Sequence, residues 1–194
     1  AGKTYRLREG SRRDSHAQAV DEHASAIGPD CGSRVVDFRG LLEALCGNGV
    51  RFILIGGAAA RIHGSARPAN DLDLFYASDP ESLKRLSTAR CDLEAFSKTP
   101  PDWDWYERRV LPIGNDLRLR TSRGNVIDMM GKNLITEPDP NLFSRSVEVD
   151  LYGCACRCVD RRTLIHLMRA VGRPKDLEAI AQLEGILEER AQLP

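Results

Sequence analysis

The sequence has no excess of charge of either sign. Its 28 Lys and Arg residues balance its 28 Asp and Glu residues, so the formal net charge at pH 7 is zero. Proteins held on nucleic acid by bulk charge are normally basic, so this balance argues against that class and leaves room only for a local basic groove. A chain of 194 residues with 42% hydrophobic residues is long enough for a domain with a sizeable core.

Long hydrophobic runs are also absent. No run approaches the roughly 20 apolar residues of a membrane-spanning helix, so we expect no membrane partner. The first residues, AGKTYRLREGSRRDSHAQ, lack the apolar segment of a secretory signal. The six cysteines have no regular spacing, which is not typical of a disulfide framework. We therefore expect reduced thiols and a cytoplasmic location.

Two well-known phosphate-binding motifs are missing as well. GGAAARIHG lacks the glycine spacing of dinucleotide-binding folds and the Lys-Ser/Thr ending of a P-loop. However, Gly56 and Gly57 follow the apolar run VRFILIG, which predicts a buried strand, and they open a predicted short helix. The N–H groups of a helix N-terminus are unpaired, and glycine lets a phosphate approach the backbone. The glycine pair is therefore either a phosphate-binding turn or a simple tight turn.

The chain divides into a polar segment and a domain. Residues 1–33 predict a tail or a loosely packed helix, or alternatively a basic arm that carries Arg6, Arg8, Arg12 and Arg13. Residues 34–194 predict one domain, with C-terminal helices from about residue 160. Residues 97–113, rich in proline and aromatics, predict an irregular excursion.

Helices and strands alternate within the predicted domain. Helical spacing and capping residues predict a helix that begins at Asp37 and ends at Gly47 or Gly49, and another that begins at Asp79 and Pro80. Strand patterns are present in DLDLFYA, in the hairpin DLRLRTSRGNVIDMM and in LYGCACRCV. Two helices close the chain, DRRTLIHLMRAVG and RPKDLEAIAQLEGILEER; the second places Leu177, Ile180, Leu183 or Glu184, and Leu187 on one face.

Two aspartates lie close together on the predicted strand DLDLFYA. Side chains alternate along a strand, so Asp71 and Asp73 point to the same side. Two carboxylates on one face repel each other unless a cation lies between them, and Mg²⁺ prefers carboxylate and phosphate oxygens. The alternative is that both acids lie on a solvated edge.

A third acid lies within the apolar segment NVIDMM. If the strand carrying Asp128 pairs beside the strand carrying Asp71 and Asp73, the three carboxylates converge. The alternative for Asp128 is a salt bridge across the hairpin to Arg118 or Arg120.

Together these motifs resemble a known superfamily. A Gly-Gly pair, a later Asp-x-Asp and a further lone Asp are similar to the polymerase-beta-type nucleotidyltransferases. HGSARPANDLDL and LIHLMRAVGRPKDLEAI resemble the bacterial minimal nucleotidyltransferases of the AbiEii toxin group, over about residues 35–187. The resemblance implies an α/β (α+β) nucleotidyltransferase fold: a small mixed twisted sheet flanked by helices, with a short C-terminal helical element.

The resemblance also implies an activity. The enzyme would transfer a nucleoside monophosphate from an NTP to an acceptor hydroxyl and release pyrophosphate, with Mg²⁺ or Mn²⁺ as cofactor. Asp71, Asp73 and Asp128 would be the catalytic and metal-binding residues. The nucleotide would be bound by Gly56, Gly57, Arg67, Arg169 and Lys175. The toxin group points to RNA, especially tRNA ends, as the acceptor and to an antitoxin as a partner.

Two other functions are compatible with these motifs. One is the modification of a small antibiotic, or of a protein, in place of RNA. The other is a degenerate relative that binds nucleotide or a partner without turnover. Ala69 replaces a threonine that is common in the group, and Met168-Arg169 replaces a common lysine. An acidic acceptor pocket would favour a cationic drug, and a basic groove would favour RNA.

Several further residues have structural interpretations. His63 is expected to cap a helix end rather than to bind phosphate. Cys154, Cys156 and Cys158 share a strand face and are expected to be buried, because a zinc site usually has a second ligand cluster. Trp103 and Trp105 either stack on a base or pack beneath their loop. Arg173 and Lys175 either reach the triphosphate or pair with surface carboxylates, and Lys132 is a weaker candidate for a phosphate contact.

Overall fold

The computed structural model describes residues 36–97, 116–131 and 142–192. Several sequence features lie outside these residues: the predicted tail with its basic arm, nearly all of the 97–113 excursion with Trp103 and Trp105, and Lys132.

A seven-stranded sheet forms the centre of the molecule, with strand order β3-β4-β5-β2-β1-β7-β6. Its strands are β1 Phe52–Leu54, β2 Leu72–Tyr76, β3 Phe96–Ser97, β4 Leu117–Arg120, β5 Val126–Met130, β6 Ser146–Leu151 and β7 Cys154–Val159. The pairs β1–β7 and β2–β5 are parallel, and the remaining four pairs are antiparallel. The predicted mixed sheet is therefore confirmed.

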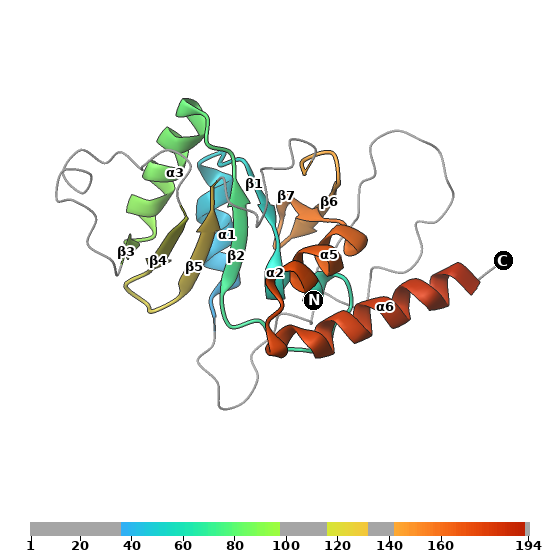
Figure 1. Cartoon of the computed structure of the whole chain (residues 1–194). Coiled ribbons are helices and arrows are strands. Elements are labelled where there is room, and N and C mark those ends of the chain that lie inside the picture. Colours follow the sequence, from blue (N-terminus) through green and yellow to red (C-terminus); the bar gives the residue numbers. More distant parts are fainter. Residues whose placement is uncertain (1–35, 98–115, 132–141, 193–194) are drawn as a thin grey trace.

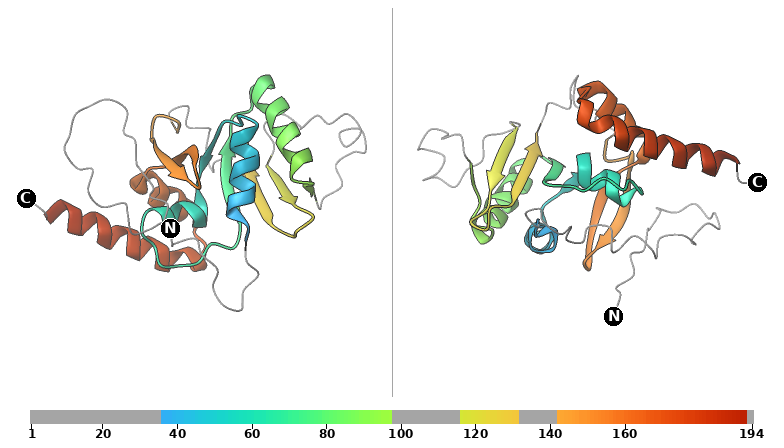
Figure 2. Two further views of the ribbon diagram at one scale, coloured as in Figure 1. Left: turned by 180° about the vertical axis from the view of Figure 1, so that it is seen from behind. Right: turned by 90° about the horizontal axis from the view of Figure 1, so that it is seen from below.

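Helices cover both faces of this sheet (Figures 1 and 2). On one face lie α1 (Phe38–Gly47) and α3 (Pro80–Asp92). On the other lie α2 (Gly56–Ile62), α5 (Arg161–Val171) and α6 (Leu177–Gln192), with the short 3₁₀ helix η2 (Pro174–Asp176) before α6. In the part of the chain that the structure describes, no helix combines the length and apolarity required to cross a membrane.

Capping residues explain where the helices begin. Asp37, Asp79 and Asp160 each accept a hydrogen bond from a backbone N–H in the first turn of α1, α3 and α5. Gly172 ends α5 in the left-handed conformation, which glycine adopts without steric cost. The sequence predicted all of these boundaries, because they depend on local chemistry.

The region LYGCACRCV was wrongly predicted as a single strand. Leu151 ends β6, Tyr152 and Gly153 turn with φ angles of +57° and +83°, and β7 begins at Cys154. Two consecutive residues with positive φ form the tight turn that matches the twist of a hairpin. The preceding strand SVEVDL and the short strand β3 were not predicted.

One residue of the last helix departs from the predicted buried face. Ile180 and Leu183 are buried, whereas Leu177 is 65% exposed. The residues before Leu177 form η2 rather than the first turn of α6, so Leu177 begins the helix at its exposed end. Its placement on the buried face was therefore wrong.

Candidate active site

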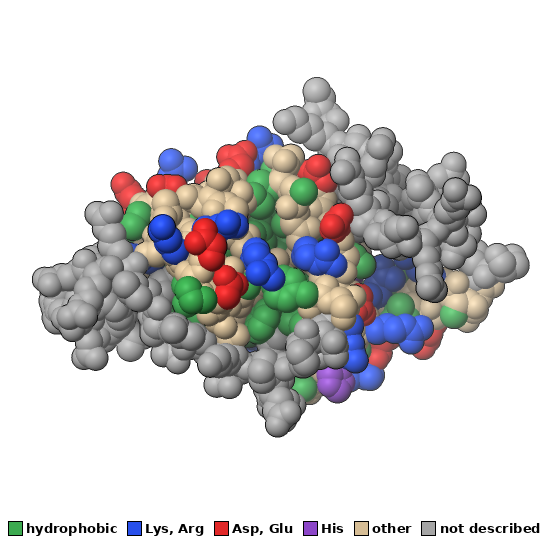
Figure 3. All heavy atoms as spheres, turned by 90° about the horizontal axis from the view of Figure 1, so that it is seen from above, with side chains coloured by type: hydrophobic (Ala, Val, Ile, Leu, Met, Phe, Trp, Pro, Cys, Tyr) green, Lys and Arg blue, Asp and Glu red, His purple; other side chains and the backbone are tan. Residues whose placement is uncertain are grey.

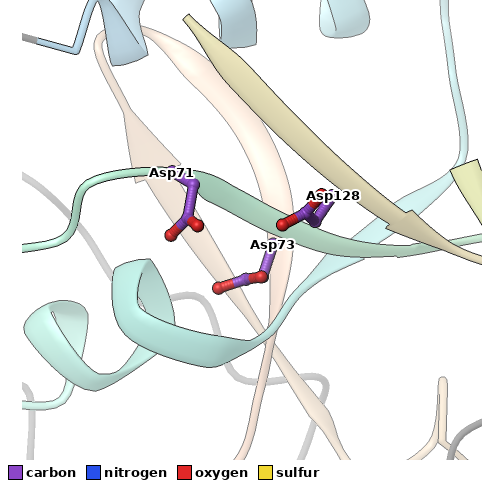
Figure 4. A group of neighbouring side chains, drawn as sticks. All are labelled: Asp71, Asp73 and Asp128. Carbon is purple, nitrogen blue, oxygen red and sulfur yellow. The ribbon is translucent and has the colours of Figure 1, made fainter. Parts of the chain in front are cut away.

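Three carboxylates converge at the centre of the sheet (Figure 4). Asp71 directly precedes β2, Asp73 lies within β2, and Asp128 lies in the parallel neighbour β5, opposite Asp73. Each contributes one oxygen to a group whose atoms all lie within 4.8 Å of one another. The predicted convergence depended on the pairing of β2 with β5, which the structure shows.

Burial makes this acidic group electrostatically costly. Burial and, to a lesser extent, the neighbouring carboxylate of Asp71 together raise the pKa of Asp73 to about 6, although a backbone hydrogen bond from Gly57 opposes the shift. Burial also raises the pKa of Asp128, against the opposing effect of Arg118. Mg²⁺ and Mn²⁺ prefer carboxylate oxygens and would relieve this repulsion, so the three residues fit a divalent cation.

The glycine pair lies against the same carboxylates. Gly57 N lies 3.3 Å from Asp73 Oδ2 and donates a hydrogen bond to it. At Gly56, where φ is +61°, an added Cβ would lie only 2.1 Å from the same oxygen. Position 56 therefore requires glycine for two reasons, the left-handed conformation and the close approach of Asp73. The sequence placed the two motifs near each other but did not predict this contact.

A cleft lies beside Asp71 and Asp73. Its lining comes from α2, the loop before β2, the end of α5, η2 and α6, and includes three basic side chains: Arg67, Arg173 and Lys175. Among the described residues, Asp128 lies outside this lining. The acidic group therefore has two sides: Asp71 and Asp73 line a cleft that also holds three basic side chains and the carboxylate of Asp176, and Asp128 lies outside that lining.

The side at Asp128 carries its own cation. Arg118 Nε lies 3.4 Å from Asp128 Oδ1, and the Arg118 side chain is 62% exposed. Arg118 pairs with Asp128 across the β4–β5 hairpin. The salt bridge and the convergence with Asp71 and Asp73, which the sequence offered as alternatives, thus coexist.

The predicted nucleotide-binding residues are distributed unevenly around the cleft. Gly57, Arg67 and Lys175 line it, whereas Arg169 forms an ion pair with Glu184 of α6. The sequence assigned no role to Asp176, which is buried and contacts both Arg67 and Arg173. Its only signal was its place in the Gly-Arg-Pro-Lys-Asp element.

The histidine and the cysteines near the site have the roles in packing and helix capping that the sequence predicted for them. His63 ends α2, and its Nε2 atom lies 2.7 Å from the carbonyl oxygen of Val159. Cys154, Cys156 and Cys158 are buried and free. Their burial is consistent with the predicted apolar role.

Solved structures share this architecture, although no protein-family model and no curated protein sequence matches the chain. One is a candidate nucleotidyltransferase from Thermotoga maritima, 16% identical with a TM-score of 0.50, which covers 78% of this chain and 91% of that chain. Another is ANT(2")-Ia in complex with adenylyl-2"-tobramycin, 14% identical with a TM-score of 0.51, which covers 79% of this chain and 88% of that chain. The chain has a nucleotidyltransferase fold. The predicted fold class is confirmed, while the AbiEii-like subgroup stays a prediction.

Proposed function

We propose that this protein transfers a nucleoside monophosphate from an NTP to an acceptor hydroxyl. The observation that carries the proposal is the convergence of Asp71, Asp73 and Asp128 beside a cleft that contains Arg67, Arg173 and Lys175. This combination, on a nucleotidyltransferase fold, matches what phosphoryl transfer requires, namely positioned reactants and charge neutralisation.

The two sides of the acidic group suit the two reactants. Asp71 and Asp73 face the cleft, whose basic side chains would bind the triphosphate. Asp128, on the other side, would accept the proton of the acceptor hydroxyl as its oxygen bonds to the α-phosphorus and the bond to pyrophosphate breaks. Bound Mg²⁺, or Mn²⁺, would neutralise the phosphate charge. Asp71, Asp73 and Asp128 are the residues that would hold it.

The residues predicted to bind the nucleotide are not all equally placed to contact a triphosphate in the cleft. Arg67 and Lys175 line the cleft and would contact the phosphates. Gly57 also lines it, but its N–H would have to leave Asp73 to reach a phosphate. The tight turn at Gly56 brings Gly57 beside Asp73. Arg169 would have to leave Glu184 to reach a nucleotide, so we assign it the weakest contribution.

We favour RNA, especially a tRNA end, as the acceptor. Arg118 places a cation directly beside Asp128, where an acceptor would approach, and this favours an anionic acceptor over a cationic one. Charges of both signs are interspersed on the face drawn in Figure 3, so RNA binding would depend on such local cations. The resemblance to the AbiEii group adds an antitoxin partner in the cytoplasm.

An antibiotic is the second candidate acceptor. Its support is the similar fold of ANT(2")-Ia, which was solved with adenylyl-2"-tobramycin. Tobramycin is polycationic, and Arg118 would repel it unless the arginine turned away from Asp128.

The decisive experiment supplies each labelled NTP with Mg²⁺ and compares three acceptors: total cellular RNA, tobramycin, and the protein alone. We expect labelled RNA with the wild type and none with Asp71→Ala/Asp73→Ala. Undiminished transfer by the double variant would refute the proposal. Labelled tobramycin with unlabelled RNA would identify the second candidate.

A degenerate, non-catalytic relative makes a different prediction. Ala69 and Met168 both line the cleft, at positions where the resembling group often has polar residues. Nucleotide binding without transfer to any of the three acceptors would support this alternative.

A further inference from the structure

A buried carboxylate joins two of the basic residues of the cleft. Asp176 is only 6% exposed, and it lies between Arg67 and Arg173. Arg173 Nε donates a hydrogen bond to Asp176 Oδ2 over 2.6 Å, and Arg67 Nη1 lies 3.8 Å from Asp176 Oδ1. The three residues line the same cleft as Asp71 and Asp73. One carboxylate thus pairs with two guanidinium groups in the cleft that Asp71 and Asp73 also line.

The loop that carries Arg67 is itself docked on the last helix. Ser65 Oγ and Ala66 N both donate to Oε1 of Gln182, over 2.8 and 2.9 Å. A Cβ added to Gly64 would lie 3.0 Å from Cδ1 of Ile186, so loop and helix are in close contact. The loop between α2 and β2 runs beside the start of α6 (Figures 1 and 2). Residues of η2 and α6 therefore fix the position of a loop more than a hundred residues earlier in the chain.

We propose that Asp176 is a positioning residue that orients Arg67 and Arg173 as a two-arginine clamp on the terminal phosphates of the nucleotide. This inference rests on the proposed function, because it assigns the cleft to the triphosphate. Two guanidinium groups repel each other, and the buried carboxylate between them offsets that repulsion.

The chemistry of arginine explains why the clamp can bind a ligand. A guanidinium has five N–H donors in a fixed fork, and each contact described above uses only one nitrogen of each arginine. The remaining donors match the paired oxygens of a phosphate. Lys175, a flexible point charge in the same cleft, adds attraction without this geometry.

The test measures binding directly and is independent of transfer. Inorganic tripolyphosphate with Mg²⁺ is the probe, because it carries the phosphate chain without a base. We expect Asp176→Asn to weaken its binding by about tenfold or more, because the arginines lose the group that orients them. Glu81→Gln is the matched control, since Glu81 is an exposed carboxylate paired with Arg85 on α3; we expect its affinity to equal that of the wild type.

A second pair of variants separates orientation from folding. Arg67→Lys and Arg173→Lys keep the charge and lose the fork, so we expect each to weaken tripolyphosphate binding by several-fold at an unchanged unfolding temperature. If Asp176→Asn does not fold, these two variants decide the question alone. Full affinity in both lysine variants, or in a folded Asp176→Asn, would overturn the clamp. So would a wild type that does not bind tripolyphosphate.

Turnover then distinguishes the clamp from the proposed function. In an active enzyme, Asp176→Asn should raise the KM for NTP more than it lowers kcat. If tripolyphosphate binding depends on Asp176 but the protein transfers no nucleotide, the clamp is supported and the proposed enzymatic activity is contradicted.

Discussion

The carboxylate of Asp73 occupies the space that any side chain at position 56 would require. A Cβ on Gly56 would lie 2.1 Å from Asp73 Oδ2, at a backbone φ of +61°. The neighbouring Gly57 donates its N–H to the same oxygen. The two motifs that the sequence shows as separate signals, Gly-Gly and Asp-x-Asp, are therefore in direct contact. Gly56 is required by the acidic group itself, whatever the role of Gly57 toward phosphate.

The first prediction compares the two glycines. Gly56→Ala should lower the free energy of unfolding by about 2–4 kcal/mol, because it adds both left-handed strain and a clash with Asp73. At Gly57 an added Cβ would lie 3.6 Å from the Cβ of Ala69, an ordinary contact. Gly57→Ala should therefore keep or slightly raise stability, by up to about 1 kcal/mol. Urea unfolding of both variants checks this, and equal losses would contradict it.

The second prediction concerns the pH dependence of stability without metal. The folded state raises the pKa of Asp73 from 3.8 to about 6, so the folded protein binds this proton more tightly than the unfolded chain. The free energy of unfolding should therefore fall as the pH rises through this interval and stay lower above it. Asp73→Asn does not titrate there and should be more stable than the wild type at about pH 8, by up to about 3 kcal/mol.

Unfolding in urea with EDTA, at about pH 4 and about pH 8, measures this difference. The gain of Asp73→Asn should be present at the higher pH and nearly absent at the lower one. Added Mg²⁺ provides the control: it should stabilise the wild type at about pH 8 and stabilise the variant much less. A variant less stable than the wild type at both pH values would show that the Asp73 carboxylate is not destabilising.

The third prediction concerns Arg118. Its guanidinium lowers the pKa of Asp128 against the effect of burial, so Arg118→Ala should raise that pKa. A base with a higher pKa loses its proton at higher pH, and the acidic limb of the transfer rate should shift upward accordingly. Arg123→Ala is the control, because Arg123 pairs with Asp37 beside the hairpin turn. Identical pH profiles for Arg118→Ala and the wild type would refute the coupling.

The fourth prediction compares two leucines of α6. Leu183 is fully buried, whereas Leu177 is 65% exposed. Leu183→Ala should cost about 2–5 kcal/mol of stability, because it opens a cavity in the core. Leu177→Ala should change stability by less than about 0.5 kcal/mol. Thermal unfolding distinguishes the two, and a similar cost at both positions would mean that the helix packs differently.

Several of these positions have a local signal in the sequence. Asp37, Asp79 and Asp160 begin helices by bonding to N–H groups three residues away, so their signal is local. The face shared by Asp71 and Asp73 follows from strand alternation alone. The hairpin that brings Arg118 opposite Asp128 was likewise visible in its turn residues.

Two other features were misjudged because the sequence gives no clear local signal for them. Leu177 has the apolar character of a buried residue, but η2 changes where the helix begins and leaves it exposed. The β6–β7 hairpin was merged into one strand because Tyr152, an unusual residue at positive φ, gave no turn signal.

The sequence by itself determined the capped helices, the glycine turn and the three candidate acids, because each depends on residues within a few positions of one another. Only the tertiary structure placed Asp128 beside Asp73, since this required the parallel pairing of β5 with β2. Only the tertiary structure also brought Asp176 between Arg67 and Arg173. The packing of the last helix against an early loop decides that contact, and no local pattern specifies such a long-range approach.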